Sequence, residues 1–212
     1  MALDRLLDDP QWRVIGLLTT ITTQFDRVAM HGIRRDVLRA QAAALSLPLI
    51  ESELEYPASN EAYENAFGAS LNAARAITPE LSHIAFGDLF LADVRSWREA
   101  LLQRLDWHAL FPLWHEPTDI LARRFHAAGH RAVLTCVDTT QLAAAFSGRD
   151  FNPALLAELT AGVDPCGENG EFHTLSYAGP RFRQPLHLQR GENVLRDGRF
   201  QYTDFLLDPV SS

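Results

Sequence analysis

Apolar runs of strand length alternate with segments of helical spacing through the first half of this 212-residue chain. Strands are predicted at residues 12–19, 48–53 and 83–88. Helices are predicted at residues 33–45, at 60–74 after a cap at Ser59 or Asn60, and at 91–105. Strands that alternate with helices predict an α/β fold, in which helices flank a parallel sheet. Ligands of such sheets bind beyond the carboxyl ends of the strands.

The second half of the chain has a different pattern, and two prolines mark the change. Pro112 and Pro117 favour an extended connector. Domains are therefore predicted at residues 1–115 and 116–212. The second is predicted to contain a helix from Thr118, a strand at 131–138, a helix opened by Asn152 and Pro153, a strand of period two at 171–177 and a hairpin turn at Asp197 and Gly198. This pattern predicts a smaller α+β lobe after the parallel sheet.

Composition narrows the class of protein. A net charge of −8 argues against nucleic-acid binding as the main function. No apolar run approaches the ~20 residues that a membrane span needs, and the first residues lack the apolar core of a secretion signal. Cys136 and Cys166 lie far apart without a CxxC pattern, so we expect reduced thiols and a cytoplasmic protein.

The segment 163–174 is the strongest candidate for a functional site. Its side chains that can ionise or hydrogen-bond are Asp164, Glu168, Asn169, Glu171, His173 and Thr174. A packed core element does not have this composition, whereas a loop that presents carboxylates, an amide and an imidazole to a ligand does.

Simpler interpretations of this segment remain open. A polar turn leading into a strand has a similar composition, and His173 has the spacing of a partly buried strand residue. A metal-dependent hydrolase centred on Asp164, Glu168, Glu171 and His173 is another interpretation. Cys166 matches no zinc-ligand spacing.

Residues 167–174 resemble a signature of the diphthine–ammonia ligase family, a branch of the PP-loop ATP pyrophosphatases with an adenine nucleotide alpha hydrolase-like (HUP) fold. Weaker blocks follow the same order, at residues 17–20, 30–33, 41–42, 85–88, 111–114 and 146–149. The resemblance covers roughly residues 14–182. It implies a parallel sheet of the PP-loop type with a smaller second lobe.

The phosphate-binding motif of that family, Ser-Gly-Gly-Lys-Asp-Ser, does not occur in this sequence. In the family it joins the first strand to the first helix, where backbone amides and the lysine hold the phosphates. Residues 1–7 resemble the body of that helix. We therefore expect either a translation start that is set too late or a degenerate family member. Because the first strand lies in the middle of the family's sheet, we also expect unpaired strand edges.

The resemblance implies an ATP-dependent enzyme that forms an amide on a carboxylate, or that adenylates it, and releases AMP and pyrophosphate. In the family the acceptor is diphthine on elongation factor 2 and the nitrogen comes from ammonia. Mg²⁺ accompanies the nucleotide. The alternative is a non-catalytic protein that binds the acceptor and has lost the phosphate loop.

The resemblance also implies roles for particular residues. The nucleotide would contact Thr19, Thr20, Gly87 and Asp88. The catalytic residues would be Glu168, Asn169, Glu171 and His173, and the acceptor would contact His31, Gly32 and Gly170. Without the resemblance, the threonines are a strand end, His31 is a loop histidine, and Gly87 with Asp88 is a common turn pair.

Overall fold

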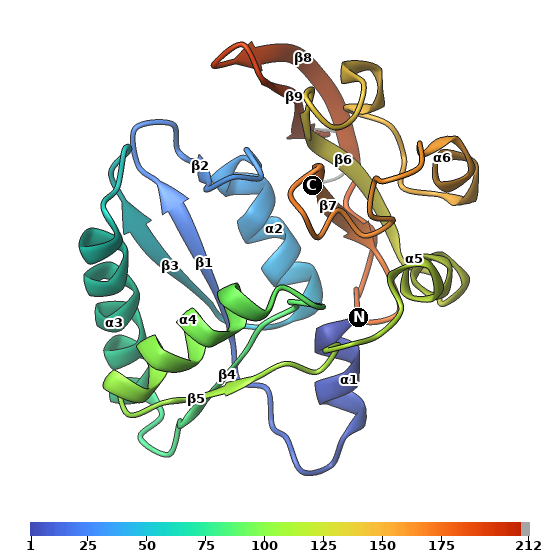
Figure 1. Cartoon of the computed structure of the whole chain (residues 1–212). Helices are drawn as coiled ribbons and strands as arrows, with labels where there is room; N and C mark the ends of the chain where they lie inside the picture. Colours follow the sequence, from blue (N-terminus) through green and yellow to red (C-terminus); the bar gives the residue numbers. More distant parts are fainter. Residues whose placement is uncertain (209–212) are drawn as a thin grey trace. The chain divides into compact units, whose positions relative to one another are not determined.

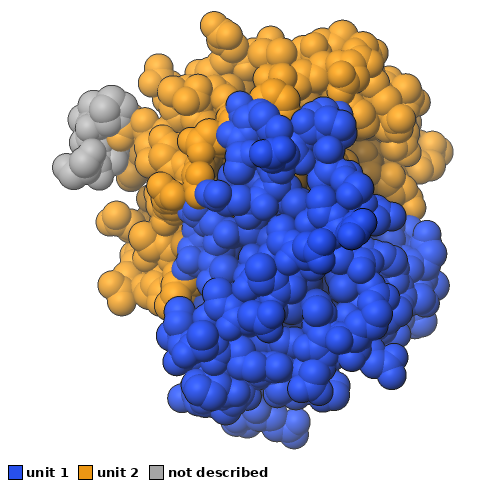
Figure 2. All heavy atoms as spheres, turned by 90° about the vertical axis from the view of Figure 1, so that its left-hand side faces the viewer, with its two compact units in different colours: residues 1–24, 49–116 blue, residues 25–48, 117–212 orange. Residues whose placement is uncertain are grey.

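The computed structural model describes residues 1–208. The chain divides into two compact units, shown in Figure 2. Unit 1 contains Met1–Gln24 and Leu49–Glu116, and unit 2 contains Phe25–Pro48 and the chain from Pro117 onward. The predicted boundary after residue 115 lies next to the change of unit at Glu116, but residues 25–48 group with the second unit rather than with the first.

Unit 1 contains the parallel strands. Its elements are α1 (Ala2–Asp8), β1 (Leu17–Thr22), β3 (Leu49–Leu54), α3 (Asn60–Ile77), β4 (His83–Ala85), α4 (Ala92–Arg104) and β5 (His108–Leu110), labelled in Figure 1. β1 pairs in parallel with β3, and β4 pairs in parallel with β5. These two pairs belong to separate sheets within residues 1–208. The predicted α/β class is confirmed.

One apolar core joins both strand pairs of unit 1 to their helices. It consists of Phe67, Leu71, Leu101, Leu102 and Trp107. Leu18 of β1 and Ile84 of β4 both pack against it. Because α3 and α4 supply most of this core, these two helices cover one face of both parallel pairs. Of the two predicted caps of α3, Ser59 is the N-cap, and its side chain accepts a hydrogen bond from the amide of Ala62, whereas Asn60 is the first residue of the helix.

Unit 2 contains an antiparallel sheet with the strand order β7-β6-β9-β8. Its elements are β2 (Arg27–Val28), α2 (Arg35–Leu45), α5 (Thr118–Ala127), β6 (Arg131–Asp138), the 3-10 turn η1 (Ala144–Phe146), α6 (Pro153–Glu158), β7 (Phe172–Ala178), β8 (Leu188–Arg196) and β9 (Phe200–Leu207). The sheet and helices confirm the predicted α+β lobe. None of the helices described for the chain is long and apolar enough to cross a bilayer.

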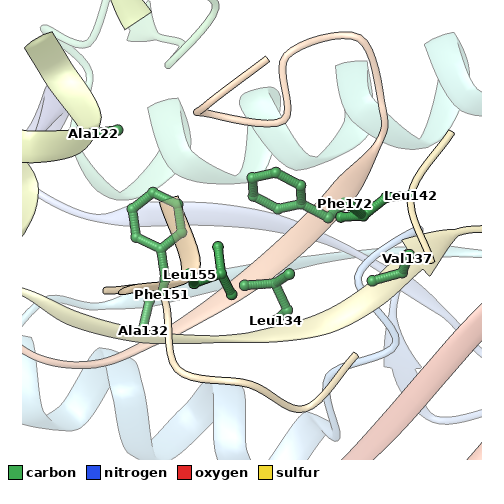
Figure 3. Packing of buried hydrophobic residues seen from close by; sticks show 8 residues of the cluster. All are labelled: Ala122, Ala132, Leu134, Val137, Leu142, Phe151, Leu155 and Phe172. Atoms are coloured by element: carbon green, nitrogen blue, oxygen red, sulfur yellow. The ribbon is translucent and has the colours of Figure 1, made fainter. Parts of the chain in front are cut away.

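The core of unit 2 lies on one face of this sheet, as Figure 3 shows. Leu134 of β6 and Phe172 of β7 pack there with Leu155 of α6. Two local features that the sequence predicts, a helix cap and a hairpin turn, are present in this unit. Asn152 accepts a hydrogen bond from the amide of Leu155 and begins α6. The predicted hairpin turn at Asp197–Gly198 joins β8 to β9.

Candidate functional site

A row of three polar side chains crosses the face of the unit 2 sheet opposite the core. In the strand register, Cys136 of β6 is the partner of His173 on β7 and of Tyr202 on β9. Cross-strand partners share a face of a sheet, so these side chains are neighbours. The next pair in the register, Val137 and Phe172, faces the core cluster instead.

The loop between β2 and α2 brings His31 onto this row. The ring centroids of His31 and His173 are 4.7 Å apart and the rings are tilted by 38°. The sequence places these two histidines in separate motifs, and the fold joins them. Nδ1 of His31 lies 3.3 Å from the carbonyl oxygen of Ala29.

Burial controls the protonation of both imidazoles. Desolvation lowers the pKa of His31 below its ordinary value of 6.5. Desolvation and, to a lesser extent, the charge interaction with His31 together lower the pKa of His173 to about 4. Both rings are therefore neutral at pH 7. A neutral imidazole accepts a proton or a hydrogen bond, which is the property required of a general base.

Gly32 has a position that only glycine fits. Its φ is +69°, and an added Cβ would lie 2.6 Å from Cδ1 of Tyr202. The backbone of the His31 loop therefore rests directly on the aromatic ring of β9. Tyr202 is a residue of this site that the sequence motifs did not identify. Its only sequence signal is its place in the strand that follows the predicted hairpin turn.

Glu171 organises the loop that precedes β7. Its side chain is 1% exposed. The carboxylate accepts hydrogen bonds from the amide of Asp164 at 2.8 Å, the amide of Asn169 at 3.0 Å and Nδ2 of Asn169 at 3.0 Å. Asp164 acts similarly, since its Oδ1 accepts from the amides of Cys166 and Glu168. Both carboxylates thus stabilise the conformation of the loop through hydrogen bonds to its own amides. The catalytic role expected for Glu171 stays a prediction.

Replacing Glu171 with glutamine is expected to lower the free energy of unfolding by about 2 kcal/mol. The new amide group would face a loop donor, and a buried polar group that loses its partner typically costs this much. Urea unfolding of the variant measures the effect. Glu192→Gln, at an exposed position on β8, is the control and should change the free energy by less than about 0.5 kcal/mol.

The other predicted site residues of this loop are more exposed than Glu171. Asn169 is exposed and Glu168 is partly buried. Gly170 has a φ of +81° with open space where a Cβ would point. These residues form the accessible rim of the loop, whereas Glu171 lies inside it.

The two cysteines are protonated. Burial raises the pKa of the Cys136 thiol to about 11 and that of the Cys166 thiol to about 12. Cys166 donates to the carbonyl oxygen of Thr118. A thiol must ionise before it acts as a nucleophile or binds a metal, so neither is poised for this chemistry. Across residues 1–208, no three His, Cys, Asp or Glu side chains are grouped so that they could hold a metal ion.

The predicted nucleotide contacts lie in unit 1. Thr19 and Thr20 stand in the middle of β1, which continues to Thr22. Gly87 and Asp88 follow β4, and a Cβ added to Gly87 would meet nothing within 4 Å. Nε of Arg98 pairs with Asp88 at 2.9 Å. The nucleotide role of these residues stays a prediction.

Residues 117–202 match the family model of the diphthamide synthase C-terminal domain. The matched segment contains the loop 164–171 and the row of His173, Cys136 and Tyr202, and it excludes His31. No curated protein matches the chain. Over residues 117–202, the match confirms the resemblance to the diphthine–ammonia ligase family.

Proposed function

We propose that this chain acts in diphthamide biosynthesis, in the ATP-dependent conversion of a carboxylate on a protein acceptor to an amide. The match of residues 117–202 to the diphthamide synthase C-terminal domain carries the proposal. That segment contains the acidic loop and His173, which the sequence resemblance assigns to the acceptor and the chemistry.

The paired histidines suit the step in which nitrogen bonds to carbon. When ammonia adds to an activated carboxylate, the new nitrogen becomes positively charged and must lose a proton. His31 and His173 are kept neutral by burial, so either can take that proton at pH 7. Asn169, which is exposed on the rim of the loop, would contact the acceptor through its side-chain amide, and the open space at Gly170 would leave room for the acceptor beside it.

Unit 1 would bind the nucleotide. ATP, when bound, supplies the activation of the carboxylate and leaves as pyrophosphate and AMP. Thr19 and Thr20 are adjacent in β1, so their hydroxyls lie on opposite faces of the strand. One of these hydroxyls and the open space at Gly87 would suit a nucleoside. Since the described residues contain no cluster of metal ligands, Mg²⁺ would be held mainly by phosphate oxygens and water.

The test supplies purified chain with ATP, Mg²⁺, ¹⁵N-ammonium and elongation factor 2 that carries diphthine. We expect ATP-dependent ¹⁵N incorporation by mass spectrometry, with AMP and pyrophosphate as products. His173→Asn should lower the rate by about 100-fold, the usual effect of losing a general base. His187→Asn, at an exposed histidine of the same unit, should leave the rate unchanged.

Other outcomes separate the alternatives. Binding of the acceptor without formation of AMP would favour a non-catalytic acceptor-binding protein. A chain that shows no acceptor binding and no turnover would contradict the proposal. Equal rates in His173→Asn and the unmodified chain would show that His173 is not the general base.

A further inference from the structure

Two side chains of β9 contact the loop that carries His31, and no sequence motif includes them. Tyr202 and Asp204 are two residues apart on this strand. Alternate residues of a strand point to the same face. Both side chains therefore project from the face of the sheet on which His173 and His31 meet.

Tyr202 contacts the loop on both sides of His31. Its ring fills the space over Gly32, where a Cβ would lie 2.6 Å from Cδ1. Its hydroxyl donates to the carbonyl oxygen of Met30 at 3.3 Å. Met30 and Gly32 have φ values of 64° and 69°. Such left-handed backbone on either side of one residue persists where the surroundings hold it.

Asp204 holds the two ends of the same loop. Its Oδ1 accepts from Nη1 of Arg27 at 2.7 Å, and its Oδ2 accepts from Nε and Nη2 of Arg34 at 3.0 and 2.6 Å. Nη1 of Arg27 also donates to the carbonyl oxygen of Gly32 at 2.9 Å. Burial alone would raise the pKa of Asp204, but the hydrogen bonds from the two arginines outweigh it and lower the pKa. The carboxylate is therefore charged at pH 7.

We propose that Tyr202 and Asp204 are positioning residues that hold the imidazole of His31 against that of His173. The inference rests on the proposed function for what the two histidines do, but not for how they are held. The ring of Tyr202 fixes the distance between the loop and the sheet. Asp204 fixes the positions of the two loop ends through its hydrogen bonds with Arg27 and Arg34. Neither side chain is required to touch the acceptor.

The test is an NMR titration of the histidine rings in the full chain. In the unmodified protein His31 and His173 should titrate below 6.5, with ring-to-ring nuclear Overhauser effects between them. Tyr202→Leu and Asp204→Asn should release the loop to solvent and raise the pKa of His31 toward the value of an exposed histidine. The ring-to-ring effects should weaken in the same variants.

Thr203→Val is the matched control. Thr203 lies between the two positioning residues, is 3% exposed, and shares hydrogen bonds with Ser147 and Asn193. It points to the other face of β9, so its loss should destabilise unit 2 and leave the titration of His31 unchanged. If Tyr202→Leu does not fold, Asp204→Asn, which is nearly isosteric, decides the result.

Two results would overturn the inference. One is an unchanged pKa of His31 in the folded positioning variants, and the other is an equal change in Thr203→Val. Failure of the proposed function can be told apart from failure of this inference, because the NMR titration needs neither ATP nor acceptor. Shifted histidines in a chain without amide-forming activity would support the positioning role and contradict only the function.

Discussion

Replacing Arg199 with methionine is expected to lower the free energy of unfolding by about 3 kcal/mol at pH 7. Asp138 is 1% exposed at the end of β6, and its carboxylate accepts hydrogen bonds from Nε and Nη2 of Arg199 at 2.9 and 2.6 Å. The same carboxylate accepts from Thr140 and Gln141. Removing the charged partner of a buried carboxylate costs about 3–5 kcal/mol. The lower end applies because the Arg199 side chain is 51% exposed.

The pH dependence of the Arg199→Met effect identifies its cause. The hydrogen bonds from Arg199 contribute most to lowering the pKa of Asp138. Stability from a lowered carboxyl pKa is present above the unfolded-state pKa of about 3.9 and is lost at lower pH. The difference between Arg199→Met and the unmodified chain, measured by urea unfolding, should therefore shrink below pH 4.

An exposed pair in the same unit provides the control for this prediction. Arg149 donates two hydrogen bonds to Glu158, but the Glu158 side chain is 55% exposed. Arg149→Met should cost less than about 1 kcal/mol, as exposed ion pairs do. Equal losses in the two variants would show that burial of Asp138 does not determine the strength of its pairing.

Acidification from pH 7 to 4.5 should lower the free energy of unfolding by about 2.5 kcal/mol through His173. Its pKa is about 4 in the folded chain and 6.5 when exposed. The unfolded chain therefore binds the proton first, and stability falls as the pH drops below 6.5. Each pKa unit corresponds to about 1.4 kcal/mol. His31, whose pKa is also lowered by burial, contributes in the same direction.

Urea unfolding at several pH values between 4.5 and 7 measures this dependence. His173→Asn removes the main titrating group and should reduce the pH dependence over that range, leaving the contribution of His31. His187→Asn, at an exposed position, should leave the slope as in the unmodified chain. If His173→Asn leaves the slope of the free energy of unfolding against pH unchanged, other groups cause the loss of stability.

The sequence by itself determined the features that depend on neighbouring residues. The alternation of strands and helices predicted the α/β class because apolar periodicity reports which face each element buries. The cap at Asn152 and the turn at Asp197–Gly198 were predicted because side-chain hydrogen bonding and backbone freedom act over a few residues. The family match at residues 117–202 includes the acidic loop that the sequence resemblance identified.

The tertiary structure alone decided which of these residues meet. His31 and His173 lie in distant segments, and their contact depends on the register of β7, β6 and β9 and on the path of residues 25–48. It also decided that Glu171 faces into its own loop, which a list of carboxylates does not reveal. Local chemistry acts within a few residues of chain, whereas burial, pKa and contact between distant segments arise only when elements pack, so no sequence spacing encodes them.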